Sequence, residues 1–228
     1  MIKAVLFDFD GTVANTLSAL REGVNLTMDL FGYPEHTEDD ILRFINHGAR
    51  ELIRSAMPEP LQHDEPLVDR VLKCYNEQLA KVFLHTDRAY DGIPELIRDL
   101  HKRYKIGILS NKQDLFLRQL SEQVLLPGTF DATQGVIPGK PTKPDRYLSD
   151  RLAASLGVRA EECAMVGDSD VDILTAKNAG MYHIGVAWGF RSVDFLLANG
   201  AVRIAEKPRD VLRLLHEAEA NGNAVAGL

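Results

Sequence analysis

Polar residues follow three apolar runs of the chain, and their side chains are of the kinds that bind cations and phosphate oxygens. They are Asp8 and Asp10, then Ser110 and Asn111, then Asp168 and Asp172. Side chains of an extended chain alternate with a period of two residues, so Asp8 and Asp10 point the same way. Two carboxylates in one small space repel each other unless a cation or a proton lies between them. The first group therefore indicates a site for a cation or for proton transfer.

The combination of side chains favours magnesium over zinc. Clustered carboxylates such as Asp8, Asp168 and Asp172 are oxygen ligands, and oxygen ligation with room for water and phosphate suits Mg2+. His and Cys, which zinc sites use, are absent from the three groups. A nearby lysine would offset the excess negative charge and hold a phosphate, and the loop 139–144 offers Lys140 and Lys143.

The apolar runs before these groups have the composition of strands that are buried on both faces. Strands are predicted at 2–7, 105–111, 130–133, 163–166, 184–187 and 202–205. From Tyr90 onward such runs alternate with segments of helical spacing. This alternation predicts an α/β fold with a doubly wound, mostly parallel sheet and helices on both faces. Ligands bind at the carboxyl ends of the strands in such sheets, so the three polar groups are expected at one edge.

Residues 15–87 have helical spacing throughout. Apolar residues recur at steps of three and four within 17–31, and a further apolar face lies within 67–79. Thr37 is placed to cap another helix between these two. We therefore expect this segment to be all-helical.

Length and composition allow two unequal domains. The chain has 228 residues and 45% hydrophobic content, which is enough for a sizeable core. The change of pattern predicts a core domain of residues 1–14 and 88–228, with a helical domain of residues 15–87 inserted into it.

Charge and composition exclude several classes of partner. The net charge is −7, with no basic run and no interleaving of aromatic and basic residues, which argues against nucleic acid or an anionic membrane. Cys74 and Cys163 are the two cysteines and lie far apart, so a reducing compartment is expected. The chain begins directly in a predicted strand and has no apolar run near the about 20 residues of a membrane span. We expect a cytoplasmic protein, either a monomer or a homodimer.

The polar groups and the lysine loop together resemble the four motifs of the haloacid dehalogenase superfamily of aspartate-nucleophile phosphohydrolases. The similar segments are Asp8–Val13, Ser110–Asn111, Lys143–Pro144 and Gly167–Asp172. They occur in the order of the superfamily's motifs, and the helical segment resembles its C1-type cap domain. The resemblance implies a Rossmann-like core with an inserted all-helical cap.

Within this superfamily the chain is most similar to phosphoglycolate phosphatases. The similar segments are 47–52, 90–96, 110–112, 179–181 and 185–190. Two positions depart from the common pattern, since Ser110 stands where Thr is frequent and Arg146 where a second Pro is common. Lys140 competes with Lys143 for the third motif, and the spacing to the later Leu156–Gly157 pair favours Lys143.

The resemblance implies a mechanism and a cofactor. Asp8 would be the nucleophile that attacks phosphorus, and Asp10 the general acid and base. Mg2+ would be bound by the side chains of Asp8 and Asp168 and the backbone carbonyl of Asp10, with Asp172 in the outer shell. The expected phosphate-binding groups are the backbone at Gly11, with Ser110, Asn111 and Lys143. The implied substrate is a small phosphorylated metabolite such as 2-phosphoglycolate.

Substrate choice is expected to depend on the helical domain, where His47, Gly48 and Arg50 lie around a predicted helix start. An alternative activity is that of a phosphosugar mutase similar to beta-phosphoglucomutase, which has the same core and cap type. A catalytically inactive binding module on this fold is the alternative from another class. Dehalogenase activity is disfavoured, because that branch needs neither an Asp at position 10 nor a metal-binding fourth motif.

Overall fold

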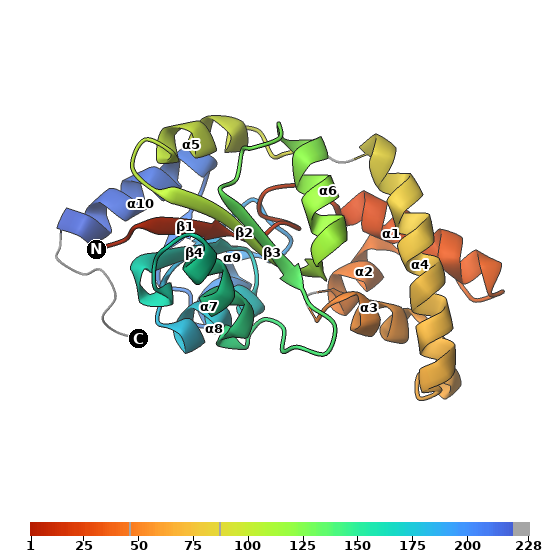
Figure 1. The fold of residues 1–228 in the computed structure, drawn as a ribbon. Helices are drawn as coiled ribbons and strands as arrows, with labels where there is room; N and C mark the ends of the chain where they lie inside the picture. The colour runs from red at the N-terminus through yellow and green to blue at the C-terminus, as the bar shows by residue number, and fades with distance from the viewer. Residues whose placement is uncertain (46, 87, 221–228) are drawn as a thin grey trace. The chain divides into compact units, whose positions relative to one another are not determined.

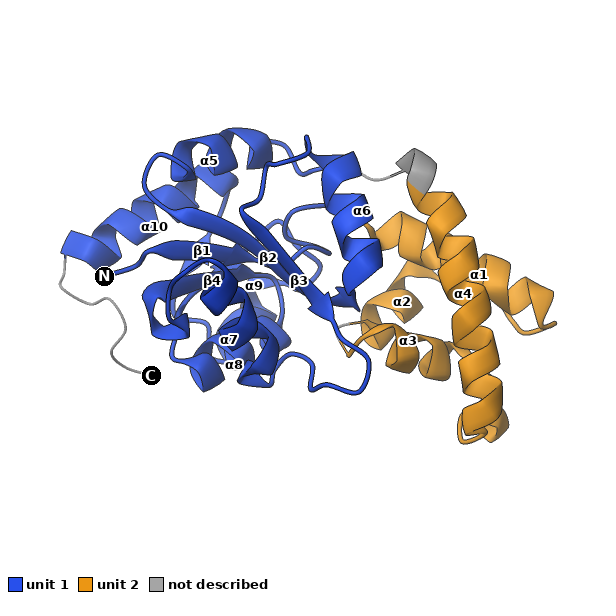
Figure 2. Cartoon of the chain, in the orientation of Figure 1, with its two compact units in different colours: residues 1–14, 89–228 blue, residues 15–88 orange. Residues whose placement is uncertain are grey.

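The computed structural model describes residues 1–45, 47–86 and 88–220. The chain divides into two compact units, residues 1–14 with 89–228 and residues 15–88 (Figure 2). Unit 1 denotes the first and unit 2 the second.

Unit 1 contains a parallel sheet of six strands (Figure 1). The strands are β1 (Ala4–Phe7), β2 (Lys105–Gln113), β3 (Ala132–Val136), β4 (Cys163–Gly167), β5 (Tyr182–Val186) and β6 (Ile204–Ala205). Their order across the sheet is β3-β2-β1-β4-β5-β6, and every neighbouring pair is parallel. The predicted doubly wound parallel sheet is therefore confirmed.

Helices cover both faces of this sheet, which is why β1 and β4 are apolar and buried along their whole length. All four residues of β1 are buried. Ala4 and Leu6 pack in one cluster with Leu152 of α7 (Arg146–Ser155) and Ala176 of α8 (Asp170–Ala179). The opposite face is covered by α5 (Ile93–Leu100) and α10 (Pro208–Ala220) (Figure 1).

The remaining elements of unit 1 lie between strands in the sequence. They are α6 (Asp114–Val124), the 3-10 turn Ala160–Glu162 and α9 (Val193–Ala198). The limits of the strands differ by one to three residues from the prediction; β3, for example, begins at Ala132 and β5 at Tyr182. Pairing sets these limits: Ala132 lies opposite Gly107 of β2, and Tyr182 opposite Ala164 of β4.

Unit 2 is helical in the part of residues 15–88 that the structure describes. Its elements are α1 (Leu17–Leu30), α2 (Glu38–Phe44), α3 (Ala49–Ala56), the 3-10 turn Glu59–Leu61 and α4 (Glu65–Thr86). Thr37 caps α2 as predicted, since its side chain accepts from the backbone N–H of Asp40 while the Asp40 carboxylate accepts from the backbone N–H of Thr37. Gly23 allows α1 to approach α4 closely, because a Cβ there would lie 2.8 Å from Leu79.

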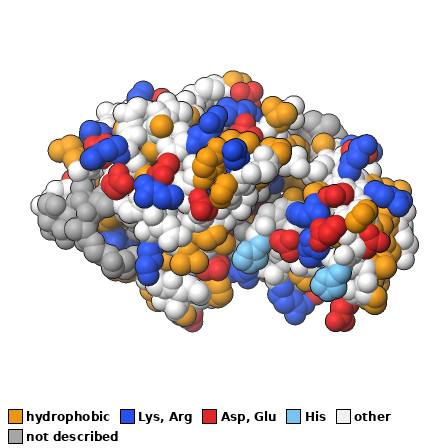
Figure 3. Space-filling view, turned by 60° about the horizontal axis from the view of Figure 1, so that its bottom comes forward, with side chains coloured by type: hydrophobic (Ala, Val, Ile, Leu, Met, Phe, Trp, Pro, Cys, Tyr) orange, Lys and Arg blue, Asp and Glu red, His pale blue; other side chains and the backbone are white. Residues whose placement is uncertain are grey.

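Acidic and basic side chains are interspersed on the face of the molecule drawn in Figure 3. Among residues 1–45, 47–86 and 88–220, no helix combines the length and the apolar composition that crossing a bilayer would require.

Candidate active site

The strand order places the candidate site at the switch point of the sheet. The chain runs from β1 outward to β2 and β3, and then returns to add β4 on the other side of β1. Phe7 of β1 lies opposite Val166 of β4, and the backbone N–H of Asp8 donates to the carbonyl of Val166 at 2.9 Å. Asp8 and Asp168 therefore emerge from adjacent strand ends, where open parallel sheets bind ligands.

Three carboxylates meet at this point. Asp8, Asp168 and Asp172 each offer an oxygen, and these oxygens lie within 4.8 Å of one another. Asp168 is held from two directions, because its Oδ1 accepts from the Thr12 hydroxyl at 3.1 Å and its Oδ2 accepts from the backbone N–H of Phe190 at 2.7 Å. Its carboxylate is thereby oriented before any ligand binds.

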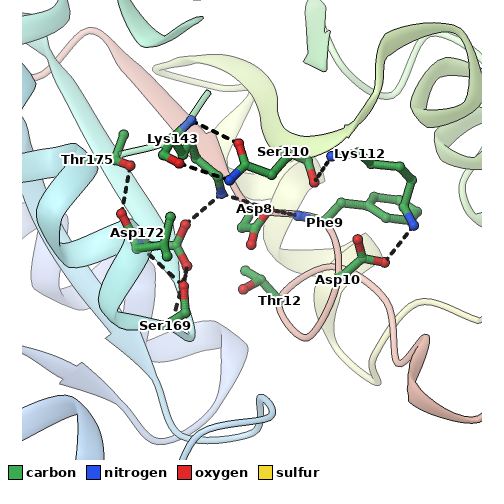
Figure 4. A network of polar contacts seen from close by, with 12 residues as sticks. Asp8, Phe9, Asp10, Thr12, Ser110, Lys112, Lys143, Ser169, Asp172 and Thr175 are labelled. Atoms are coloured by element: carbon green, nitrogen blue, oxygen red, sulfur yellow. Dashed lines mark hydrogen bonds and ion pairs between the residues drawn. The ribbon is translucent and has the colours of Figure 1, made fainter. Parts of the chain in front are cut away.

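Lys143 provides a positive charge between two of these carboxylates (Figure 4). Its Nζ lies 3.0 Å from Asp8 Oδ1 and 2.7 Å from Asp172 Oδ1, and its side chain is 3% exposed. Lys140, the competing candidate, is exposed and lies over the ring of Tyr147, with its Nζ 5.9 Å from the ring centroid. The geometry favours Lys143 as the lysine of the third motif.

Asp172 also shapes the start of a helix. The residue is fully buried, and its Oδ2 accepts from the Ser169 hydroxyl at 2.6 Å. The Ser169 hydroxyl in turn accepts from the backbone N–H of Asp172, which forms a capping box at the N-terminus of α8. This arrangement fixes the carboxylate that receives the Lys143 ammonium.

The second motif lies within β2, which extends further than predicted. Ser110 is 2% exposed, and its hydroxyl accepts from the backbone N–H of Lys112 at 3.4 Å. The side-chain amide of Asn111 donates to the carbonyl of Lys143 at 3.0 Å, and its oxygen accepts from the backbone N–H of Lys143 at 2.9 Å. Asn111 therefore holds the loop that carries Lys143.

Asp10 lies in the turn after β1 and faces a second lysine, as Figure 4 shows. The Nζ of Lys112 is 3.2 Å from Asp10 Oδ1, and the two side chains are 8% and 24% exposed. Gly11 adopts a φ of +79° in this turn, a conformation that favours glycine. The sequence analysis included Lys112 in the similar segment 110–112 but did not predict its contact with Asp10.

Burial and mutual repulsion shift the ionisation of the carboxylates. Burial raises the pKa of Asp8 to about 7, although the Lys143 ammonium counteracts this, and Asp172 and Asp10 add to the rise. Burial, with contributions from Asp172 and Asp8, raises the pKa of Asp168 to about 8. Burial disfavours the Lys143 ammonium, but Asp172 and Asp8 outweigh that effect and hold its pKa above the ordinary value. The single ammonium of Lys143 does not neutralise all three carboxylates, so a surplus of negative charge remains in the cluster.

This donor set fits a hard divalent cation. The clustered ligand atoms are all carboxylate oxygens and they are close together. The pKa values of Asp8 and Asp168 are raised by burial and, in addition, by repulsion among the carboxylates, which a cation would relieve. Asp8, Asp168 and Asp172 are therefore the residues that could hold a metal ion here.

Two glycines make room for the carboxylate of Asp168. A Cβ at Gly11 would lie 2.4 Å from Asp168 Oδ2, and a Cβ at Gly189 would lie 2.2 Å from Asp168 Cβ. Gly189 precedes Phe190, whose N–H binds Asp168. The sequence analysis gave Gly11 a role in phosphate binding, whereas it included Gly189 only as part of the similar segment 185–190 and gave it no role.

The predicted specificity residues belong to unit 2, whereas the other predicted site residues belong to unit 1. His47 is exposed, and Gly48 lies at the N-cap of α3 with a φ of +85°. The guanidinium of Arg50 donates to Glu65 at 2.5 Å and also to Asp69. Arg50 therefore already has two anionic partners within its own unit.

Comparisons with known proteins agree with this geometry. The family described as Haloacid dehalogenase-like hydrolase matches residues 5–186. Pyrophosphatase PpaX of Listeria innocua serovar 6a is 32% identical over 222 residues, which cover 96% of this chain and 98% of that protein. Phosphoglycolate phosphatase of Vibrio parahaemolyticus serotype O3:K6 is 25% identical over 219 residues, which cover 94% and 96%.

A solved structure is similar over the same extent. The protein from Lactobacillus delbrueckii subsp. bulgaricus, provisionally assigned as a phosphoglycolate phosphatase, superposes with a TM-score of 0.85 at 30% identity. The match covers 93% of this chain and 98% of that one. The resemblance inferred from the four motifs is confirmed: the chain belongs to the haloacid dehalogenase-like hydrolases, and it is an enzyme of the phosphatase type.

Proposed function

We propose that the protein is a Mg2+-dependent phosphomonoester hydrolase that acts through an aspartyl-phosphate on a small phosphorylated metabolite. The observation that carries this proposal is the buried group of Asp8, Asp168 and Lys143 at the switch point of the sheet. It combines a nucleophile, ligands for a hard cation and an ammonium for phosphate in one small volume. Phosphoryl transfer depends mainly on such positioning and charge stabilisation.

In the first step, an oxygen of Asp8 attacks phosphorus and the bond from phosphorus to the leaving oxygen breaks. Asp10 gives its proton to that leaving oxygen as general acid. In the second step, Asp10 takes a proton from water, and the water oxygen attacks phosphorus. The bond between phosphorus and Asp8 breaks, and inorganic phosphate is released.

The other residues hold the phosphoryl group and the cation. The Ser110 hydroxyl, the Lys143 ammonium and the backbone N–H groups around Gly11 would donate to phosphoryl oxygens. Asn111 would act through the Lys143 loop that it holds. Mg2+ would be bound by the side chains of Asp8 and Asp168 and the carbonyl of Asp10, with Asp172 in the outer shell, and when bound it supplies positive charge for the transferring group.

For the substrate, we propose a compact metabolite such as 2-phosphoglycolate, chosen by unit 2 acting as a cap domain. The similarity to a phosphoglycolate phosphatase supports this choice, and the similarity to a pyrophosphatase widens it. His47, Gly48 and Arg50 are the proposed specificity residues. Arg50 would have to exchange Glu65 or Asp69 for the substrate, and exposed ion pairs of this kind are weak enough to exchange. A cytoplasmic location stays a prediction.

The test is phosphate release from a panel of small phosphomonoesters, with Mg2+ and with a chelator. Asp8→Asn should abolish turnover while the fold persists, because the amide has nearly the same shape but is a poor nucleophile. Phosphate release by purified Asp8→Asn protein above a metal-free blank would contradict the proposal. Formation of an isomer from a sugar phosphate, without phosphate release, would instead indicate the mutase.

A further inference from the structure

Lys112 is a nearly buried cation for which the mechanism above has no use. It lies near the end of β2, and its side chain is 8% exposed. Its Nζ lies 3.2 Å from Asp10 Oδ1 and 5.6 Å from the centroid of the Phe116 ring. An ammonium is costly to bury unless anions or aromatic faces surround it. This position is therefore built to keep a positive charge next to Asp10.

The two lysines of the site lie beside different carboxylates. Lys143 contacts the nucleophile Asp8, whereas Lys112 contacts the general acid Asp10 (Figure 4). A general acid must come within hydrogen-bond reach of the oxygen that it protonates. The leaving oxygen must therefore bind next to Asp10, which brings the group attached to it near the Lys112 ammonium.

We propose that Lys112 binds a second anionic group of the substrate, carried by the leaving group next to the scissile bond. This inference rests on the proposed function and narrows its substrate class. In 2-phosphoglycolate the carboxylate carbon is two bonds from the leaving oxygen, and in pyrophosphate the leaving oxygen belongs to the second phosphoryl group itself. An ammonium has three donors, so Lys112 can contact Asp10 and such an anion together.

A matched pair of substrates tests this role. Ethyl phosphate has the same carbon chain as 2-phosphoglycolate but carries a methyl group in place of the carboxylate. Lys112→Met should lower kcat/KM for 2-phosphoglycolate by about 10- to 100-fold, which is the range for one charge-assisted hydrogen bond. For ethyl phosphate the loss should be at least about fivefold smaller than for 2-phosphoglycolate, and Lys112→Arg should recover part of the loss on 2-phosphoglycolate.

The matched control is Lys105→Met in the same strand. Lys105 lies at the exposed start of β2, where its Nζ is 3.5 Å from Asp131. The Lys105→Met variant should have the wild-type kcat/KM for both substrates. Equal losses on both substrates in Lys112→Met would overturn the proposal and make Lys112 a positioning residue for Asp10. No loss on either substrate would overturn it as well.

An inhibitor comparison in the wild-type enzyme gives a second test that needs no variant to fold. Glycolate should inhibit the hydrolysis of ethyl phosphate. Glycolamide has the same shape without the charge, and its inhibition constant should be at least about tenfold higher. Equal inhibition by the two compounds would overturn the proposal. Failure of the proposed function would look different, because wild-type enzyme with Mg2+ would then release phosphate from neither substrate.

Discussion

At the residue scale, the environment of Lys143 makes its charge necessary for both fold and reaction. Lys143→Ala would leave the carboxylates of Asp8 and Asp172 buried without their shared ammonium. We expect the free energy of unfolding to fall by about 3 to 5 kcal/mol, because breaking a buried ion pair leaves an uncompensated charge. We also expect kcat/KM per folded molecule to fall at least about tenfold through the lost contact to a phosphoryl oxygen.

Lys140→Ala is the control for this prediction, because Lys140 lies in the same loop but is exposed. Denaturant unfolding and phosphatase kinetics on Lys143→Ala and Lys140→Ala compare the contributions of the two lysines to stability and to activity. Greater damage from Lys140→Ala than from Lys143→Ala would show that Lys140 is the lysine of the third motif.

At the scale of elements, the segment after β5 holds Asp168 in place. Its backbone N–H at Phe190 donates to the carboxylate, and Gly189 leaves the space that the Asp168 side chain fills. Gly189→Ala would place a methyl group 2.2 Å from the Asp168 Cβ, so the loop or the aspartate must move. We expect Mg2+ affinity and kcat to fall at least about tenfold, with the fold retained.

Mg2+ titration of Gly189→Ala beside Asp168→Asn measures this effect. The two variants should lose Mg2+ affinity to a similar extent, because both disturb the same carboxylate. Wild-type Mg2+ affinity in Gly189→Ala would show that Asp168 does not need this support.

The first turn of α3 carries the proposed specificity residue Arg50. We expect Arg50→Ala to lower kcat/KM for 2-phosphoglycolate by about tenfold and to leave p-nitrophenyl phosphate, which lacks the carboxylate, little affected. Arg54→Ala is the matched control, since Arg54 also pairs with Glu65 but lies one turn further along the helix. If Arg50→Ala and Arg54→Ala lowered kcat/KM for 2-phosphoglycolate equally, Arg50 would have a structural role within unit 2.

At the scale of the whole molecule, stability should depend on pH through the buried carboxylates. Burial raises the pKa of Asp8 to about 7 and that of Asp168 to about 8, whereas unfolded aspartates lose their protons near 3.8. Between these values the folded state binds more protons than the unfolded state, so metal-free stability should fall as pH rises from about 4 to about 8. Bound Mg2+ would take the place of these protons, so we expect the increase in Tm on adding Mg2+ to be larger at pH 8 than at pH 6.

Thermal melts with Mg2+ and with a chelator at the two pH values check this prediction. In Asp168→Asn the dependence on pH should weaken, because one of the two groups no longer titrates. An equal increase in Tm at pH 6 and pH 8 in the wild type would contradict it.

The sequence by itself determined where the chain could do chemistry. Apolar runs buried on both faces predict the central strands, and carboxylates directly after β1 and β4 predict the acidic cluster, because parallel strands share one carboxyl edge. The helical spacing of residues 15–87 likewise predicts helices, since periodicity is a local property. The four motifs, read in order, were sufficient to recognise the family.

Only the tertiary structure decided which side chains meet. The contacts of Lys143 with Asp8, of Lys112 with Asp10 and of Phe190 with Asp168 join segments that are distant in the sequence. Strand order, strand register and the path of each loop bring such residues together, and none of these is visible in local periodicity. Spacing in the sequence favours Lys143 over Lys140, but the contacts of Lys143 with the buried carboxylates depend on the whole fold, because burial and charge pairing do.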